Sequence, residues 1–248
     1  EKNHEIELQK LNKELEKHVT ELEFSNEQLE QFAFIASHDL QEPLRMISSF
    51  MKQLKRKYGD LLDEKGHQYI HFATDGANRM KQIILDLLEY SRAGRELEIP
   101  ELIDTTKVIE EYKILRKKII EDKKANITYD KLPTLKVHQA PYTQIFHCLI
   151  DNSIKYSKVE EAPSIHISCQ ESKDQWLFSI KDNGIGIPKQ FHEKIFVIFQ
   201  RLHSKEEYEG TGIGLSIVKK HIESWGGRVW LESKLGKGST FYFTIKKL

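Results

Sequence analysis

The sequence has few of the features that mark secreted, membrane or nucleic-acid-binding proteins. Its 248 residues contain no run of eighteen apolar residues and open with no signal-peptide pattern, so we expect no membrane-spanning helix. The 38 basic residues balance 38 acidic ones, so no overall positive charge favours nucleic acid or an anionic membrane surface. The only two cysteines, Cys148 and Cys169, lack metal-type spacing and indicate reduced core thiols of a cytoplasmic protein.

The first part of the chain is rich in charged residues and carries leucines at a regular spacing. From Leu8 onward, seam positions recur at alternating steps of three and four, which predicts a parallel coiled coil over residues 1–30. The polar members His18 and Ser25 either fix the register of the coiled coil or are simply tolerated. The seam consists of Leu11, Leu15, His18, Leu22, Ser25, Leu29, Phe32 and Ala36.

The helical pattern continues beyond the coiled coil into a hairpin over residues 31–95. A helix from about residue 2 to 57 would be roughly 80 Å long. Pro43 should kink this helix without ending it, because the apolar spacing resumes at once. A second amphipathic helix ends near Gly94, which suits a helix C-cap. Two helices bury only one face each, so we expect two copies to complete a four-helix bundle as a homodimer.

After Pro100 the pattern changes, and residues 96–248 are predicted to form a separate domain. Asp104 should cap a helix that runs to about Lys124. Because strands then follow one another without strict alternation with helices, we expect an α+β sandwich: a mixed, largely antiparallel sheet with helices on one face. The other expected elements are short strands around Asp130 and Pro133, a helix over 139–156, strands over 164–170 and 175–181, a helix after Gly212 and two final strands.

Two glycine clusters suggest a nucleotide site under a mobile lid. They are Asp182–Ile187 and Gly210–Leu215, with the lid between them at residues 188–209. Glycine lets backbone N–H groups approach a phosphate, and the second cluster runs into an apolar helical pattern whose N-terminus would face the anion. A dinucleotide-binding fold is not favoured, because no strand directly precedes the second cluster, and the lysine of a Walker loop is absent.

Asn152, Lys155 and Tyr156 lie about one turn apart on the predicted 139–156 helix. An asparagine oxygen can ligate Mg²⁺ that is held mainly by phosphates. The alternative for Asn152 is a helix C-cap.

Histidines in the helical hairpin form a second group of candidates. The carboxylate of Asp39 could accept one ring proton of His38 and leave the other ring nitrogen as a nucleophile. His67 and His71, spaced i and i+4, lack a third ligand, so a solvated helix face is favoured there over a metal site.

The order of these motifs closely resembles that of the two-component sensor histidine kinases over nearly the whole chain. The histidine box is Ser37–Arg45 and the asparagine box Leu149–Ser157; a phenylalanine box, Ile195–Arg201, lies between the two glycine boxes. The histidine and phenylalanine boxes look most like those in the output end of cyanobacterial phytochromes. The resemblance implies an ATP-dependent protein-histidine kinase, with a phosphotransfer hairpin followed by a Bergerat-type ATP-binding domain of the gyrase, Hsp90, kinase and MutL superfamily.

The resemblance also implies roles for single residues. His38 would be the phosphoacceptor and Asp39 its acid–base partner. Asn152 would ligate Mg²⁺, and Asp182 would accept the amino group of adenine. The other implied ATP-binding residues are Lys155 and Arg201 at phosphate, Tyr156 at the nucleotide edge, Gly184, Gly186, Gly210, Gly212 and Gly214 in the pocket and lid, their neighbours Thr211 and Leu215, and Thr240 in the adenine pocket.

Partners follow from the same resemblance. The phosphoryl group would pass from His38 to an aspartate of a separate response-regulator receiver domain. Because the chain opens at Glu1 without an initiating methionine, we expect an upstream sensor domain that acts by twisting the coiled coil. Whether His38 accepts phosphate from its own subunit or from the other depends on the hand of the loop at residues 58–66, and both options stay open.

Two positions depart from the family pattern. The family usually has asparagine four residues before the magnesium ligand, and ATP-hydrolysing relatives have glutamate near there; this chain has Cys148, so we expect poor hydrolysis of ATP by water. Bifunctional members carry threonine or asparagine four residues after the histidine, to position water; here the residue is Glu42, so we expect a bias towards kinase activity.

Two alternatives belong to other functional classes. An ATP-driven conformational machine like Hsp90 or MutL would share the nucleotide fold, but His38 with Asp39, and the cysteine at position 148, count against it. A non-enzymatic dimerisation scaffold would need no intact pocket, so Asn152, Asp182 and both glycine clusters count against that one.

Overall fold

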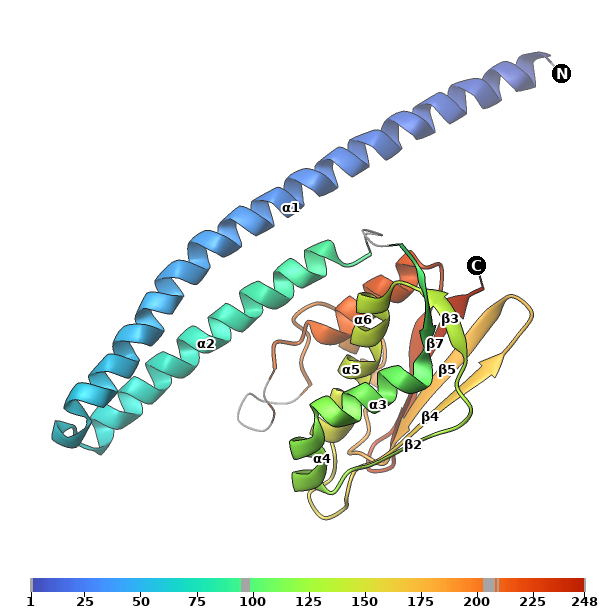
Figure 1. Ribbon diagram of the computed structural model, residues 1–248. Coiled ribbons are helices and arrows are strands. Elements are labelled where there is room, and N and C mark those ends of the chain that lie inside the picture. The colour runs from blue at the N-terminus through green and yellow to red at the C-terminus, as the bar shows by residue number, and fades with distance from the viewer. Residues whose placement is uncertain (1, 95–98, 203–207, 209, 248) are drawn as a thin grey trace. The chain divides into compact units, whose positions relative to one another are not determined.

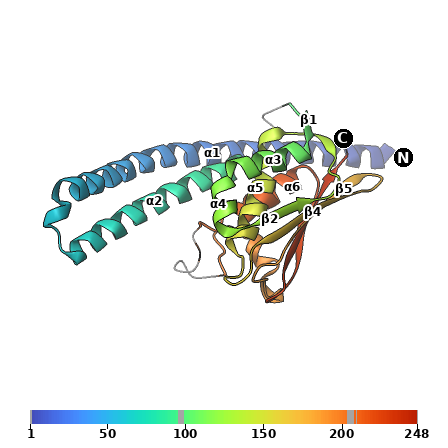
Figure 2. The same cartoon turned by 60° about the horizontal axis from the view of Figure 1, so that its bottom comes forward.

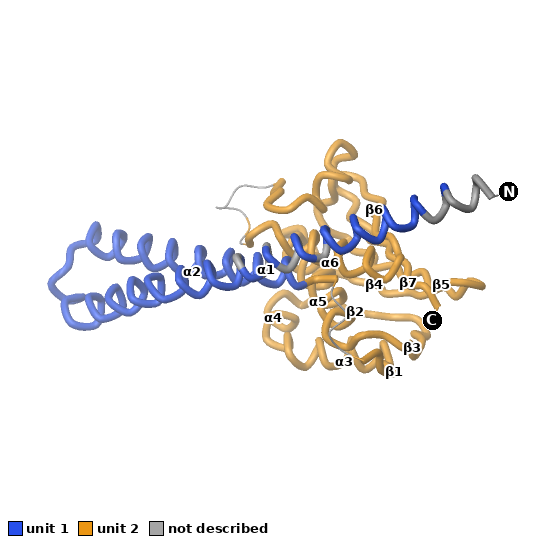
Figure 3. The backbone as a smooth tube through the Cα atoms, turned by 90° about the horizontal axis from the view of Figure 1, so that it is seen from above, with its two compact units in different colours: residues 1–92 blue, residues 93–248 orange. Residues whose placement is uncertain are grey.

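The computed structural model divides the chain into two compact units, Glu1–Arg92 and Ala93–Leu248, which Figure 3 colours separately. It describes residues 2–94, 99–202, 208 and 210–247. The predicted boundary at residues 95/96 falls outside the described residues and stays a prediction. The first helix runs without a break through the other predicted boundary, at residue 30.

Unit 1 is a helical hairpin (Figure 1). Helix α1 (Lys2–Tyr58) leads through a short 3-10 helix η1 (Gly59–Leu61) into helix α2 (Glu64–Arg92), which runs back along α1. Pro43 lies inside α1, and the helix continues beyond it as predicted. Gly94 follows α2 with a φ of +84°, a left-handed conformation that suits the predicted C-cap. None of the described helices combines the length and apolarity needed to cross a membrane.

The hairpin buries few apolar side chains by itself. Leu44 of α1 and Ala77 of α2 are buried, whereas most large apolar side chains of both helices are exposed. Exposed apolar surface costs roughly 25 cal/mol per Å² relative to burial, so covering this surface would stabilise the hairpin. The exposed residues include Leu11, Leu15, Leu22, Phe34, Phe50, Leu54, Tyr69, Phe72 and Met80. The side chains of three predicted seam residues, Leu8, Leu29 and Phe32, lie outside the described part of the chain.

Unit 2 is built on a five-stranded sheet in the order β2-β4-β5-β7-β6. Strand β2 pairs with β4 in parallel, and the other neighbouring strands pair antiparallel. The predicted mixed, largely antiparallel sheet is therefore confirmed. The strands are β2 (Asn126–Tyr129), β4 (Ser164–Glu171), β5 (Gln175–Asp182), β6 (Val229–Lys234) and β7 (Gly238–Lys246).

Helices α3 (Thr105–Leu115), α5 (Gln139–Lys155) and α6 (Gly214–Ser224) cover one face of this sheet (Figures 1 and 2). Every strand of the sheet contributes buried apolar residues to the core, among them Ile165 and Ile167 of β4. The Phe146 ring of α5 meets the Phe178 and Phe243 rings of the sheet edge-on, at centroid distances of 5.6 Å each. Edge-on aromatic pairs of this kind add to the stabilisation from burial alone. The α+β sandwich predicted from the sequence is thus confirmed.

The helix predicted from Asp104 to about Lys124 is in fact two helices. The Asp104 side chain caps α3 as predicted, accepting a hydrogen bond from the Thr106 N–H at 2.9 Å. The chain leaves helical geometry at Arg116, and α4 (Lys117–Lys123) follows. Arg116 donates to a carboxylate oxygen of Asp151 on α5 at 2.8 Å. The break thus coincides with a contact between helices, which local sequence does not encode.

A second, two-stranded sheet was not predicted as such. Strand β1 (Glu101–Asp104) pairs antiparallel with β3 (Thr134–Val137). The sequence predicts β3 but not β1, because β1 has its two apolar residues, Leu102 and Ile103, next to each other and shows no alternation of apolar and polar side chains.

Candidate functional site

The candidate phosphoacceptor His38 lies on the exposed side of α1. Ser37 and Leu44 are buried within the hairpin, and this orientation leaves 75% of the His38 side chain exposed. Its Nδ1 lies 3.2 Å from Oδ1 of Asp39, which is also exposed. In the tautomer that donates Nδ1–H to Asp39, Nε2 carries the lone pair. The geometry therefore suits a nucleophile that reacts with a group brought from outside.

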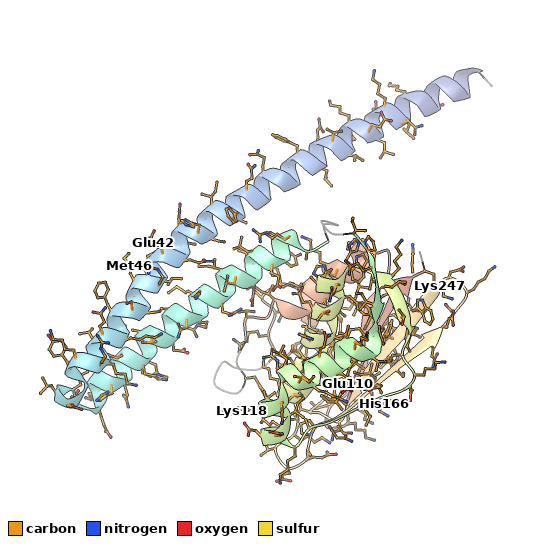
Figure 4. All side chains as sticks on the ribbon, in the orientation of Figure 1. Glu42, Met46, Glu110, Lys118, His166 and Lys247 are labelled. Carbon is orange, nitrogen blue, oxygen red and sulfur yellow. The ribbon has the colours of Figure 1, made fainter. Side chains whose placement is uncertain are left out.

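Glu42 and Met46 share the helix face of His38. The three residues follow one another at i, i+4 and i+8, a spacing that aligns side chains along a helix. Figure 4 shows Glu42 and Met46 about one turn apart on α1, and both are exposed. A carboxylate thus occupies the position one turn after the histidine.

Asp182, at the end of β5, is a buried carboxylate of unit 2. Its Oδ1 accepts hydrogen bonds from the backbone N–H of Gly184 at 2.8 Å and of Ser239 at 3.0 Å. Burial raises the pKa of Asp182, while these two bonds and one from Ser153 act in the opposite direction. Because both backbone donors meet the same oxygen, the carboxylate is fixed in orientation and can offer Oδ2 to a ligand.

The first glycine cluster packs directly against the end of α5. A Cβ on Gly184 would lie 2.6 Å from the carbonyl oxygen of Tyr156, so no larger residue fits there. The Ile185 N–H donates to that same carbonyl at 3.0 Å. Gly186 has a φ of +71°, and a Cβ there would lie 2.1 Å from the Lys234 carbonyl oxygen. These contacts hold the Asp182 loop and the asparagine box together.

The prediction for Thr240 is corrected by the register of the sheet. Thr240 lies directly opposite Lys181 and Glu232, so it shares the face of the sheet that these exposed residues occupy. Asp182 follows Lys181 and points to the opposite face, because side chains alternate along a strand. The residue beside the Asp182 carboxylate is instead Ser239, whose backbone N–H binds it.

The end of α5 carries the three predicted polar residues together. Tyr156, not Asn152, is the C-cap of α5, so the alternative interpretation of Asn152 as a capping residue is wrong. Asn152 Nδ2 donates to the Cys148 sulfur at 3.7 Å. Lys155 Nζ lies 3.0 Å from the Tyr156 hydroxyl and 4.5 Å from the centre of its ring. Amide, ammonium and phenol groups therefore gather at one helix end.

The second glycine cluster meets these residues from the other side. A Cβ on Gly210 would lie 2.9 Å from Lys155 Nζ. Gly214 opens α6, and a Cβ there would lie 3.0 Å from the Cys148 sulfur. Gly212 has a φ of +79° and contacts Arg201. Thr211 and Leu215 are half-buried next to them, and Leu215 packs against the core.

Part of the predicted lid is described. Arg201 donates to the carbonyl oxygen of Tyr208 at 2.6 Å, and the Tyr208 and Tyr156 rings lie 4.8 Å apart. Tyr208 thus links the phenylalanine box to the end of α5. Residues 203–207 and 209 of the predicted lid lie outside the described residues.

Three residues of this region were missed by sequence reasoning. Ser239 could have been found from its place directly after Gly238, but Ser153 and Tyr208 carry no local signal. All of the predicted unit 2 residues other than Thr240 gather around Asp182, the end of α5 and the start of α6. Within the described chain, no group of three His, Cys, Asp or Glu side chains is placed to hold a metal, so the His67 and His71 pair gains no third ligand.

Comparisons with known proteins agree with this geometry. Residues 28–96 match the family model "His Kinase A (phospho-acceptor) domain", and residues 137–248 match "Histidine kinase-, DNA gyrase B-, and HSP90-like ATPase". Cyanobacterial phytochrome A of Nostoc sp. is 46% identical over 232 residues, which are 94% of this chain. The chain spans 30% of the length of that relative.

Solved structures share the fold. Full-length ShkA in complex with AMPPNP superimposes with a TM-score of 0.67 at 22% identity, over 87% of this chain and 45% of that one. The histidine kinase ThkA in complex with the response regulator TrrA gives a TM-score of 0.58 at 24% identity, over 88% of this chain and 61% of that one.

Proposed function

Because the chain belongs to the sensor histidine kinases, we propose that it transfers the γ-phosphate of ATP to His38 and then to an aspartate of a separate response-regulator receiver domain. The observation that carries this proposal is the presence, in one chain, of an exposed histidine–carboxylate pair and a converged set of nucleotide-binding groups. His38 and Asp39 supply the first; Asp182, Asn152 and the glycine clusters supply the second.

The adenine is selected at Asp182. With Oδ1 occupied by the Gly184 and Ser239 backbone donors, Oδ2 accepts a hydrogen bond from the exocyclic amino group. Tyr156 borders the nucleotide from the end of α5. Guanine carries a carbonyl oxygen at the position of that amino group, so a fixed carboxylate oxygen would repel it.

The phosphates lie between the ends of two helices. Helix α6 begins at Gly214 and directs its first N–H groups towards them, while Lys155 and Arg201 supply positive charge. Asn152 is the residue that would hold Mg²⁺. The part of the chain that the structure describes holds no cluster of three acidic, histidine or cysteine side chains for a metal, and one neutral amide oxygen fits a cation that arrives mainly bound to phosphates. When bound, the cation neutralises charge on the transferring group.

Phosphoryl transfer then needs a correctly protonated imidazole in line with the γ-phosphate. A bond forms between Nε2 of His38 and phosphorus as the bond to the β-phosphate oxygen breaks and ADP leaves. The Nδ1 proton stays on the ring, and Asp39 stabilises the imidazolium that develops. His38 belongs to unit 1 and the nucleotide groups to unit 2, so the reaction requires the two units to approach each other.

The proposed assembly is a homodimer through the exposed apolar face of the hairpin. An upstream sensor domain would act through the N-terminal coiled coil. The phosphatase reaction is disfavoured, because Glu42 presents a negative charge where a phosphohistidine and an attacking water would lie. Hydrolysis of ATP by water is also disfavoured, because the Cys148 thiol stands in place of a carboxylate base.

The test is incubation with Mg²⁺ and γ-labelled ATP, beside His38→Ala and His18→Ala. His18 is a matched control: it lies on the same helix, is 76% exposed and also neighbours a carboxylate, Glu21. We expect protein-bound label that acid removes and alkali spares, in the parent and in His18→Ala but not in His38→Ala. Label retained in His38→Ala would refute the assignment. ATP binding without label in the parent would favour an output domain that is silent without its sensor, or a binding scaffold.

A further inference from the structure

Cys148 is the residue at which this chain departs from the family pattern, and its surroundings suggest what it does. It lies one turn before Asn152 on α5, and the Asn152 amide nitrogen donates a hydrogen bond to its sulfur at 3.7 Å. On the other side, a Cβ on Gly214 would lie 3.0 Å from the same sulfur. The thiol therefore lies between the Asn152 amide on α5 and the first residue of α6.

The contact has a consequence for the opposite end of the amide. An amide group is planar, with its nitrogen and oxygen on opposite sides of the same carbon, so a hydrogen bond that holds the nitrogen also sets the direction of the oxygen. In the described chain the acceptor for Asn152 Nδ2 is the Cys148 sulfur. The oxygen is thus turned away from Cys148, which is the arrangement that a metal ligand requires.

We propose that Cys148 is a positioning residue for magnesium binding: its sulfur holds the Asn152 amide so that Oδ1 faces the cation carried by ATP. The inference rests on the proposed function, since it takes Asn152 as the magnesium ligand. When a residue that hydrogen-bonds a metal ligand is removed, the affinity for the metal typically falls by about 10-fold to 100-fold. The size of the effect here belongs at the lower end of that range, because sulfur is a weak hydrogen-bond acceptor.

Two substitutions separate positioning from simple packing. Cys148→Ala removes the acceptor, while Cys148→Ser keeps an acceptor of similar placement. Cys169→Ala is the matched control, because it removes the other half-buried thiol, which lies on β4 away from Asn152. Asn152→Ala tests the metal ligand itself.

The measurement is calorimetric binding of ATP to the full chain at a series of Mg²⁺ concentrations, with a matched titration in EDTA. We expect Cys148→Ala to raise the half-saturating Mg²⁺ concentration about 10-fold. We expect Cys148→Ser and Cys169→Ala to stay close to the parent. Binding of ATP in EDTA should change little in all of these variants, which shows that the pocket is folded.

The outcomes distinguish the positioning role of Cys148 from the role of Asn152 as the magnesium ligand. If Asn152→Ala raises the Mg²⁺ requirement and Cys148→Ala does not, the positioning role is refuted and the metal ligand stands. If Cys148→Ala and Cys148→Ser weaken ATP equally in EDTA and in Mg²⁺, the sulfur serves packing alone, and the inference is again refuted. If Asn152→Ala leaves the Mg²⁺ requirement unchanged, both the ligand assignment and the inference fall.

Discussion

The two units place their reactive carboxylates in opposite environments. In the hairpin, 72% of the Asp39 side chain is exposed beside a histidine that is 75% exposed. In unit 2, Asp182 is only 8% exposed and is held by two backbone donors. A group that must receive phosphate from another unit has to be reachable, whereas a group that selects a base gains from the exclusion of water. In the proposed function, the exposure of Asp39 and the burial of Asp182 therefore follow from their different roles.

The same contrast holds for stability. Unit 2 surrounds its nucleotide groups with a continuous core, in which Phe146, Phe178 and Phe243 are fully buried. Among the described side chains of unit 1, Leu44 and Ala77 are the buried apolar ones, and most of the large apolar side chains are exposed. We therefore expect unit 2 to hold its structure by itself and unit 1 to depend on a second copy. The predictions below test this division.

The largest expected effect is on assembly. Phe50 is 59% exposed on α1, in the apolar face that we assign to the dimer. Phe50→Asp would place a charge in that interface twice, once from each copy, and should weaken dimerisation by at least about 1,000-fold. Sedimentation over a range of protein concentrations measures this. ATP affinity should be unchanged, because the nucleotide groups belong to unit 2.

Lys52→Asp, which changes charge at a neighbouring exposed position, is the control and should remain dimeric. If Phe50→Asp sediments with the same mass as the parent at all concentrations, the dimer uses another surface. The claim that unit 1 depends on a second copy through this face would then be wrong.

A smaller effect is expected on the chemical step. Asp39→Asn keeps the shape of the side chain but removes the negative charge that stabilises the imidazolium. The rate of His38 labelling should fall about 100-fold, the lower end of the range for acid–base groups. ATP affinity should not change. Glu21→Gln, which removes the carboxylate beside His18, should label at the parent rate; equal loss in both variants would point to a general effect of charge on α1.

The sequence predicts much of this fold because most of its elements have strong local patterns. Helix α1 was expected over residues 2–57 and extends over Lys2–Tyr58, and β5 was expected over 175–181 and extends to Asp182. The break at Arg116 was not predictable, since a hydrogen bond to Asp151, 35 residues away, accompanies it.

The site was predictable to the extent that its residues lie in motifs. The error at Thr240 is instructive, because a shift of one residue along a strand moves a side chain to the other face of the sheet. The motif places a small polar residue after Gly238, but only the pairing of Thr240 with Lys181 decides which residue faces Asp182. The contact of Cys148 with Gly214 likewise depends on the packing of two helices and is invisible in the sequence.

Nucleotide affinity should depend on pH through Asp182. Burial raises the pKa of this carboxyl, so its protonation begins at a higher pH than for an ordinary aspartate near 3.9. In the proposed function the ionised carboxylate accepts a hydrogen bond from the adenine amino group. The affinity for ATP should therefore fall as the pH is lowered towards that raised pKa. Asp182→Asn should bind about 10-fold to 100-fold more weakly at pH 7.5, the cost of a charged hydrogen bond, and lose this pH dependence.

Binding titrations at several pH values check this, with the exposed Asp174→Asn as the control, which should behave as the parent. Equal pH dependence in Asp182→Asn and in the parent would contradict the role of Asp182 as the base contact.

The smallest expected effect concerns how the free energy of unfolding of unit 2 depends on pH. Burial, with a smaller contribution from Lys220, lowers the pKa of His221 to about 4. An unfolded histidine titrates near 6.5, so between about pH 6.5 and 4 the unfolded state binds more protons, and the free energy of unfolding should fall as the pH falls. Asp182 acts with the opposite sign, because its raised pKa favours the folded state on acidification, so the comparison must be made between variants.

Urea unfolding at pH 7.5 and 5 should therefore show a smaller loss of stability in His221→Leu than in the parent. The exposed His166→Leu should lose as much as the parent. An equal loss in His221→Leu would mean that the buried imidazole does not control the acid response. The buried His221 and the buried Asp182 both belong to unit 2, so their pKa shifts should make pH act on the stability of that unit.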